Sequence, residues 1–502
     1  MDRDSSSAAA VTGPTQQGRQ AARGAVWSAG GQVAMAVFGI VWLFTVPRTL
    51  GPASYGIFVL LSSLVDFHST ACCLGVHNAF AYHFPRFRAE GTLAPFATSY
   101  AATVAVVSAV GLGVLVLVAQ VLGGGAVTAV MMLAIVSTAV FQAANTVLGG
   151  VLYGNNRIRL YSMRFPLQLM LQLVAVLAGW RLWKLDGAMM GLAAGMGIAT
   201  LWLLWVVRPA SKYRPSLLPW SQLRAPLTFG VLAIFGSLAA LTLTRGGNII
   251  LAGVGRSPSE IGSFAVAVGF VLQGVGLLGG LGSALTPSLA ALRAAGEEDR
   301  AAEWAIRAAR YQAIFGLLGT AFVALIGKQI LQMALGPRFD NVFPITLVSI
   351  CGLLPLAQGG LANQFSVAWG HPRLNLENWG VLSGVFIILG ILLAHYYGSL
   401  GMATGLVAAA WAAGVYAGLR LRSLGGPNIW NPGVLKLLAL ALPGALLLRG
   451  EPGLGLSAAL FTGFAIYLTA GGLLSRAISV QDLRDIVLSL KPHAPNSPST
   501  GR

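Results

Sequence analysis

The sequence predicts an all-α integral membrane protein with about fourteen transmembrane helices: two pseudo-symmetric six-helix bundles around a central cavity, and two additional helices at the C-terminal end. Composition supports this class, because 56% of the 502 residues are hydrophobic and only 9% are charged, whereas soluble domains carry about 25% charged residues. Long apolar stretches also recur from Gly24 to Leu474. The 64 glycines suit close helix packing in lipid.

The expected spans follow from these apolar stretches, which are joined by short connections containing turn formers such as Gly51-Pro52 and Gly370-His371-Pro372. The largest polar insert, from Arg293 to Arg310, is expected to be a solvated helical extension and leaves no room for a soluble catalytic domain. The spans are expected at 25–46, 56–84, 96–120, 126–153, 164–183, 187–207, 226–253, 261–290, 308–326, 342–369, 375–396, 399–419, 434–448 and 453–474.

The net charge of +17 reflects basic residues that are dispersed among short loops, which argues against a nucleic-acid-binding face. Most of the 32 Lys and Arg residues fall in the even-numbered loops, among them Arg86, Arg157 and Arg373. Because basic loops stay on the cytoplasmic side, both termini are expected inside the cell. Residues 1–24 are expected to form a disordered cytoplasmic tail, and residues 479–502 a second cytoplasmic tail.

No enzyme motif or cofactor site is indicated. Cys72, Cys73 and Cys351 all lie in apolar runs without metal-ligand spacing, so they are expected to be packing residues and no metal site is predicted. The stretch 274–279 matches GxGxxG, but it lies inside an expected span and lacks the strand that a dinucleotide site needs. Gly276 and Gly280 have instead the spacing of small residues at a close helix contact. The prediction is therefore a protein that is not an enzyme and has no cofactor.

Two pairs of similar junctions indicate an internal repeat with a period of about 200 residues. The junction 50–58 is similar to 254–264, and 153–157 is similar to 369–373. Six helices per repeat place both repeats in the same orientation, so they form parallel repeats about an axis normal to the membrane. The expected division is an N-terminal bundle at 25–220, a C-terminal bundle at 221–425, and two additional helices at 426–478.

The first third of the chain resembles the polysaccharide transporter branch of the multidrug/oligosaccharidyl-lipid/polysaccharide flippase superfamily, the Wzx-type O-antigen flippases. The resemblance rests on Leu50-Gly51-Pro52, Tyr55-Gly56, Phe58, Ser63-Leu64, Phe67, Leu74-Gly75, Asn78-Ala79, Pro85-Arg86 and Gly336-Pro337-Arg338-Phe339. It implies a carrier in the bacterial inner membrane that moves polyprenyl-diphosphate-linked oligosaccharides from the inner to the outer leaflet by alternating access, for polysaccharide biosynthesis.

The implied partners are the lipid-linked oligosaccharide, membrane lipids and a polysaccharide polymerase machinery, with H⁺ or Na⁺ as the coupling ion. Members that couple transport to ions often have an acid in span seven. This chain has Arg245-Gly246-Gly247-Asn248 there, which leaves the coupling ion open.

Polar residues within spans are the candidate substrate contacts, because ionisable groups in lipid are costly. If span two is one continuous helix, Ser62, Asp66, Thr70, Cys73 and His77 share a face, and about 16 Å separates Asp66 from His77. This stripe either lines a cavity or forms a polar packing seam. In span seven, Thr242, Arg245 and Asn248 share a face.

Arg245 is expected inside the membrane, where a guanidinium could pair bidentately with a diphosphate. The alternative for Arg245 is an ion pair with Asp66. Weaker candidates are amides, for which hydrogen bonding between helices is the commoner role, and a basic residue near a helix end. They are Gln142, Asn145, Arg164 and Gln168, with Asn78 beside His77.

Three other functions remain open. A cation-coupled multidrug or small-molecule antiporter of the related extrusion family would need an acid-lined site, and Asp66 is the one clear acid in the expected spans. A membrane glycosyltransferase or polymerase would normally need a large outer loop, and the outer loops here are short. A membrane scaffold without transport activity is the last alternative.

Overall fold

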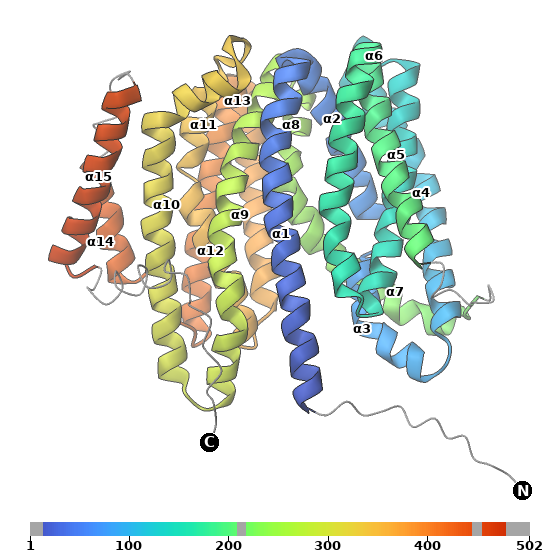
Figure 1. The fold of residues 1–502 in the computed structure, drawn as a ribbon, viewed down its shortest axis with the longest axis horizontal. Coiled ribbons are helices and arrows are strands. Elements are labelled where there is room, and N and C mark those ends of the chain that lie inside the picture. The colour runs from blue at the N-terminus through green and yellow to red at the C-terminus, as the bar shows by residue number, and fades with distance from the viewer. Residues whose placement is uncertain (1–13, 208–216, 444–453, 478–502) are drawn as a thin grey trace, which may run out of the picture. The chain divides into compact units, whose positions relative to one another are not determined.

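The computed structural model describes residues 14–207, 217–443 and 454–477, and helices account for nearly all of them (Figure 1). The all-α membrane class expected from composition is confirmed. The elements are α1 Pro14–Leu50, α2 Pro52–Cys72, α3 Val76–Ala89, α4 Leu93–Gly123, η1 Gly124–Ala126, α5 Ala129–Gly154, α6 Ile158–Val207, α7 Trp220–Leu241, η3 Thr242–Gly246, α8 Gly247–Gly253, α9 Pro258–Ala294, α10 Glu298–Leu335, η4 Pro337–Phe339, α11 Val342–Ile350, α12 Leu353–Ala368, α13 Arg373–Ser423, α14 Pro432–Ala441 and α15 Leu454–Leu474.

Ten helices of the described residues are long and apolar enough to cross a membrane, or eleven if the bent pair α11 and α12 is one span. Two of these ten, α6 and α13, contain a reversal and so comprise two helices each. Non-helical backbone lies at Trp183 and Lys184 in α6 and at Gly398 in α13. The expected pairs of spans at 164–183 and 187–207, and at 375–396 and 399–419, correspond to these halves.

Close glycine contacts hold the two halves of each reversal together. A methyl group at Gly179 would overlap the backbone of Gly187, and one at Gly401 would overlap the backbone of Leu393. Small residues let antiparallel helices approach this closely without side chains between them. The total of fourteen spans stays a prediction, because the expected span 434–448 begins in the short helix α14 and then runs into residues outside the described part.

The second expected span is not one continuous helix. It is broken between α2 and α3, where Leu74 and Gly75 have φ values of 48° and 60°. Tyr100 on α4 donates a hydrogen bond to the freed carbonyl of Leu74, and the backbone of Gly230 on α7 packs against Gly75. The stripe from Asp66 to His77 therefore does not lie on one continuous helix, although Asp66 contacts Gln142 on α5 and His77 contacts Arg164 on α6.

Several smaller expectations also need correction. Residues 14–24, expected in a disordered tail, form the first turns of α1, while residues 1–13 and the expected tail 479–502 lie outside the described residues. Cys351 stands at the 46° bend between α11 and α12 and is exposed, so it is not a packing residue, whereas Cys72 and Cys73 are buried. A methyl group at Gly276 or Gly280 would meet no atom within 4 Å, so neither glycine mediates the expected close contact.

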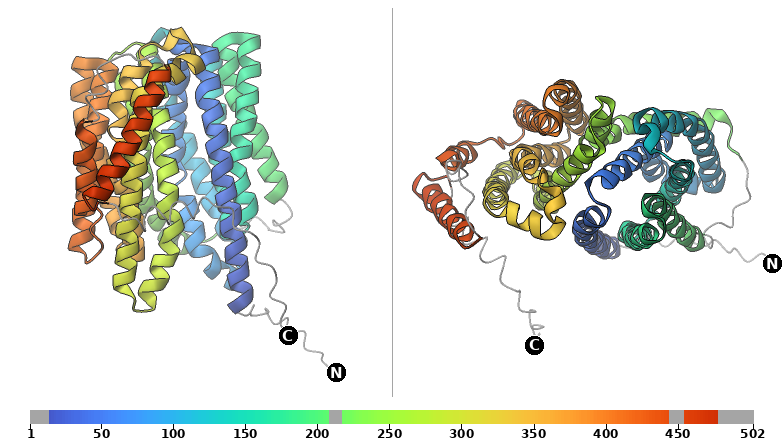
Figure 2. Two further views of the ribbon diagram at one scale, coloured as in Figure 1. Left: turned by 60° about the vertical axis from the view of Figure 1, so that its left-hand side comes forward. Right: turned by 90° about the horizontal axis from the view of Figure 1, so that it is seen from above.

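The helices α9 and α10 form an unusually long hairpin (Figures 1 and 2). They contain 37 and 38 residues, or about 55 Å each at 1.5 Å per residue, well beyond the ~30 Å hydrocarbon core of a bilayer. Their connected ends carry ion pairs between Arg293 and Glu298 (3.0 Å) and between Arg307 and Glu303 (2.6 Å). The expected charged helical extension is present.

The chain divides into two compact units. Unit 1 comprises Met1–Trp42 and Leu64–Ile234, and unit 2 comprises Leu43–Ser63 and Phe235–Arg502. The core of unit 1 is an aromatic cluster around Phe80, Phe96 and Tyr100. In unit 2, the core lies among α10, α12, α13 and the pair α14 and α15, which packs against α10 (Figure 2).

Similar contacts occur within each unit at positions that correspond in the expected repeat, which stays a prediction. In unit 1, Arg88 at the end of α3 donates to Oδ1 of Asn155 after α5, at 2.7 Å. In unit 2, Arg293 at the end of α9 donates to the carbonyl of Ala368 at the end of α12, at 3.1 Å. In both units, an arginine near the end of one span, α3 or α9, donates a hydrogen bond to the end of another span, α5 or α12.

Candidate functional site

The side chain of Arg164 lies between three helices of unit 1. Arg164 is in the second turn of α6 and only 3% exposed. Its Nη1 donates to the backbone carbonyl of Asn145 on α5 at 3.0 Å, and its Nη2 lies 3.5 Å from Nε2 of His77 on α3. The structure thus brings together three of the candidates expected from the sequence.

The shape of the surrounding helices explains how this guanidinium fits. A methyl group at Gly149 on α5 would overlap Nη1 of Arg164, so only glycine leaves space for the charge at this position. The guanidinium carbon lies 4.2 Å from the ring centre of Phe165 and 5.3 Å from that of Tyr161. Aromatic faces attract cations, most strongly where water is excluded. We refer to Asn145, Gly149, Arg164, His77 and Tyr161 as the Arg164 cluster.

The Arg164 cluster has more hydrogen-bond donors than acceptors. Among the described residues, no carboxylate lies within ion-pair distance of Arg164, and its Nε and the Nδ2 of Asn145 are buried without a hydrogen-bond partner. Buried donors without acceptors cost about 1–3 kcal/mol each, and more when charged. Such a site is suited to an anionic acceptor, and a phosphate oxygen matches the planar donors of arginine.

The remaining candidates in unit 1 do not belong to this cluster. Gln142 on α5 donates to Oδ1 of Asp66 on α2 at 3.0 Å, so these two candidates form a separate polar contact. Thr70 and Gln168 are half-buried, and Asn78 is exposed.

In unit 2, the three candidates of span seven lie on or beside a π-helical turn, η3. Thr242 is buried and donates back to the carbonyl of Leu238 at 2.9 Å. Arg245 is half-buried within η3. Asn248 on α8 is buried and donates to Oγ of Ser63 on α2 at 3.0 Å. π-Helical turns are frequent at functional sites.

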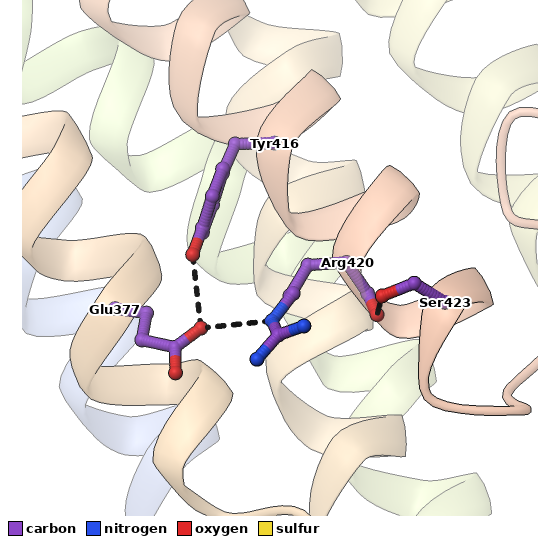
Figure 3. Close-up of polar contacts among 4 residues, drawn as sticks. All are labelled: Glu377, Tyr416, Arg420 and Ser423. Atoms are coloured by element: carbon purple, nitrogen blue, oxygen red, sulfur yellow. Dashed lines mark hydrogen bonds and ion pairs between the residues drawn. The ribbon is translucent and has the colours of Figure 1, made fainter.

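Some contacts were not expected from the sequence. Tyr161 and Phe165 flank Arg164 on the same helix; the spacing of three residues from Tyr161 was an available signal, whereas that of one residue from Phe165 was not. The contact with Gly149 is long-range and had no local signal. A further polar group in unit 2 joins the two halves of α13 (Figure 3), where Tyr416 and Arg420 both donate to Oε2 of Glu377, at 2.9 and 3.3 Å.

The Glu377 group is best explained as a structural contact. Its side chains are partly exposed, 44% for Arg420 and 37% for Glu377, and exposed ion pairs contribute about 0–1 kcal/mol. Within the described residues, no group of three or more His, Cys, Asp or Glu side chains could hold a metal ion.

Comparisons with known proteins reveal similarity at the level of structure. No family model matches this chain, and no curated protein sequence matches it. The chain is similar to the lipid II flippase MurJ in an inward closed conformation, with a TM-score of 0.70 and 11% identity over 92% of this chain and 99% of that one.

The MATE transporters are also similar. An inward-facing multidrug resistance MATE family transporter of the MOP superfamily has a TM-score of 0.62 and 14% identity over 78% of this chain and 95% of that one. A MATE transporter from Vibrio cholerae has a TM-score of 0.51 and 17% identity over 81% and 98%. The protein therefore has the multi-pass helical fold found in MurJ and in MATE transporters.

Proposed function

We propose that the protein is a flippase that carries a polyprenyl-diphosphate-linked oligosaccharide from the inner to the outer leaflet by alternating access, for polysaccharide biosynthesis. The observation that carries the proposal is the Arg164 cluster: a buried guanidinium without a carboxylate partner, next to an amide donor that also lacks an acceptor. The proposed setting is the bacterial cytoplasmic membrane, with both termini inside. The chain is proposed to act as a carrier and not as an enzyme.

The chemistry of the Arg164 cluster favours an anionic substrate. A diphosphate offers several acceptor oxygens to the guanidinium and to the Asn145 amide, and the charge of arginine persists at any biological pH. Because the cation is 3% exposed, the substrate reaches it when the surrounding helices move apart. Independently of the Arg164 cluster, Arg245, half-buried on the π-helical turn of unit 2, is a proposed diphosphate contact, with Asn248 and Thr242 beside it.

The main alternative is a cation-coupled antiporter of small molecules, which the similarity to MATE transporters keeps open. Such a carrier would require an acid able to bind cations. Asp66 is the acid of span two, and Gln142 donates to it, which leaves less of its hydrogen-bonding capacity for a cation. The structural match to MurJ covers 92% of the chain, against 78% and 81% for the two MATE transporters. Both observations favour the flippase.

Depletion of the protein in its host should cause lipid-linked oligosaccharide to accumulate on the cytoplasmic face of the membrane, because synthesis continues while export stops. The measurement is extraction of lipid-linked intermediates, with their sidedness determined by an impermeant glycosidase added to intact cells and to inverted vesicles. An unchanged amount and sidedness, together with greater sensitivity to cationic drugs, would contradict the flippase and support the antiporter.

A further inference from the structure

Three glutamine side chains lie where α9, α10 and α12 pack together within unit 2. Gln312 on α10 and Gln358 on α12 are both 0% exposed, and Gln364 on α12 is half-buried. The amide oxygen of each is buried, and among the described residues it has no hydrogen-bond partner. A buried acceptor without a donor is costly, so three such oxygens in one part of the fold point to a ligand.

The orientation of the three amides is fixed by their nitrogens. Nε2 of Gln312 and Nε2 of Gln364 donate to neighbouring backbone carbonyls on α9, at 3.2 and 3.4 Å. Nε2 of Gln358 donates to the carbonyl of Ala309 on α10 at 2.8 Å. Turning any of these amides over would place its oxygen against a carbonyl oxygen. The nitrogens are therefore held on helix backbone, and the oxygens are the ends left to bind a ligand.

The contacts of Gly316 show that two of the glutamines share one layer of the helix junction. A methyl group at Gly316 on α10 would lie 3.3 Å from Cδ1 of Leu354 on α12 and 3.6 Å from Cδ1 of Leu278 on α9. These three residues therefore lie at one level. One helical turn from this level toward the connection between α9 and α10, α10 carries Gln312 and α12 carries Gln358.

The third glutamine reaches the same layer from the next part of α12. A methyl group at Gly282 on α9 would overlap Oε1 of Gln364. Gly282 is itself one helical turn beyond Leu278, so this oxygen lies at the level of Gln312 and Gln358. Amide oxygens from two helices thus share a layer, next to a position of α9 where glycine leaves space for them.

The chemistry of this layer favours a small cation of single charge. Amide and carbonyl oxygens are ligands for hard cations. Residues 261–292 of α9 and all of α12 contain no charged side chain. On α10 the nearest charge is that of Arg310, whose Nη1 donates to the carbonyl of Ala477 at 3.5 Å. Because the cost of burying an ion rises with the square of its charge, neutral oxygens in the interior suit a monovalent cation better than a divalent one.

We propose that Gln312, Gln358 and Gln364 bind one dehydrated alkali-metal cation, Na⁺ or K⁺, through their amide oxygens. The oxygens replace part of the hydration shell of the cation, as carbonyl oxygens do in potassium channels, and the cation links α9, α10 and α12. The site belongs to unit 2 alone and does not depend on the proposed substrate. A buried water molecule is the competing ligand, because water can donate to two such oxygens.

The first test compares chloride salts at equal ionic strength, using the purified full-length protein in lipid nanodiscs without any lipid-linked substrate. A ligand that binds only the native state raises the midpoint of thermal unfolding. The midpoint should rise and then saturate as NaCl or KCl replaces N-methylglucamine chloride. Equal midpoints in all three salts would identify a water molecule or simple packing and overturn the cation site. That result would leave the proposed flippase untouched, because no step of transport is measured.

The second test measures cation affinity by calorimetric titration of variants at Gln358. Gln358→Leu removes one ligand oxygen and should weaken binding about ten-fold or more. Gln358→Glu keeps the shape and adds a negative charge beside the cation, so it should strengthen binding about ten-fold. The matched control is Gln172→Leu, which removes a buried amide of unit 1, 8% exposed, and should leave the affinity unchanged.

The two substitutions at Gln358 have opposite expected effects on affinity. A general loss of stability in Gln358→Leu therefore cannot imitate the result. Equal affinities of Gln358→Leu and Gln172→Leu would overturn the assignment, and so would a Gln358→Glu variant that binds the cation no more tightly than the unchanged protein.

Discussion

Replacement of Arg164 with glutamine is expected to slow translocation of the lipid-linked substrate roughly ten- to hundred-fold, because a hydrogen bond to a charged group is worth about 1.5–3 kcal/mol and each 1.4 kcal/mol is a factor of ten. Arg164→Lys should retain part of the activity, since it keeps the charge but loses the planar fork. The measurement is the initial rate of translocation per molecule of protein in the membrane.

Two further variants separate substrate binding from a structural role of Arg164. Gly149→Ala should reduce transport while leaving every charge in place, because the added methyl group displaces the guanidinium. Arg159→Gln removes a cation that lies 4.5 Å from the ring of Trp27 on the outside of the same helix, and should have little effect. Normal transport by Arg164→Gln would contradict a substrate-binding role of Arg164. So would an equal loss of thermal stability and of protein in the membrane for all of these variants.

The second large effect is expected at Arg245. If Arg245 binds the diphosphate, Arg245→Gln should abolish flipping and Arg245→Lys should retain part of it, because both charge and geometry matter. If it only neutralises Asp66, each single change would leave an unpaired charge, at a cost of about 2.5–3.5 kcal/mol on insertion scales, and Arg245→Gln combined with Asp66→Asn would remove both charges.

A translocation assay on Arg245→Gln, Arg245→Lys, Asp66→Asn and the double variant decides between these two roles, with the amount of protein in the membrane as the control. The diphosphate role predicts an inactive double variant. Full activity of the double variant would exclude that role and leave an internal ion pair.

The elements that depend on local sequence could be predicted. The apolar stretches marked the helices, and the gaps at 184–186 and 397–398 marked the reversals in α6 and α13, because a short polar or glycine-containing interval is enough to turn an antiparallel pair. The repeat stays a prediction, which rests on junctions that share glycine and proline, residues with special backbone requirements.

The candidate site was less predictable, because its contacts join distant parts of the chain. Arg164 stood out as a basic residue near a helix end, but its burial depends on Gly149 and on the aromatic rings beside it, and no spacing rule connects α5 to α6. The break at Leu74 and Gly75 was also missed. A glycine inside an apolar run is common in membrane helices, so Gly75 alone did not distinguish a break from a packing contact.

Asn248 is a second residue whose long-range contact could not be predicted from local sequence. Its position in the register of Thr242 and Arg245 suggested a cavity, and the structure places it in a hydrogen bond with Ser63, 185 residues away. The pattern of polar residues on one helix cannot distinguish a cavity from a contact that a second helix covers.

The most direct measurement of the central claim is translocation by the purified protein in liposomes. A polyprenyl-diphosphate-linked saccharide with a fluorescent label is placed in both leaflets, and an impermeant quencher reports how much label reaches the outer surface. A flippase that recognises the diphosphate should give protein-dependent quenching of the inner-leaflet label, and no such quenching for a matched polyprenyl saccharide without the diphosphate. Equal translocation of both lipids, or none of either by protein that is folded and inserted, would contradict it.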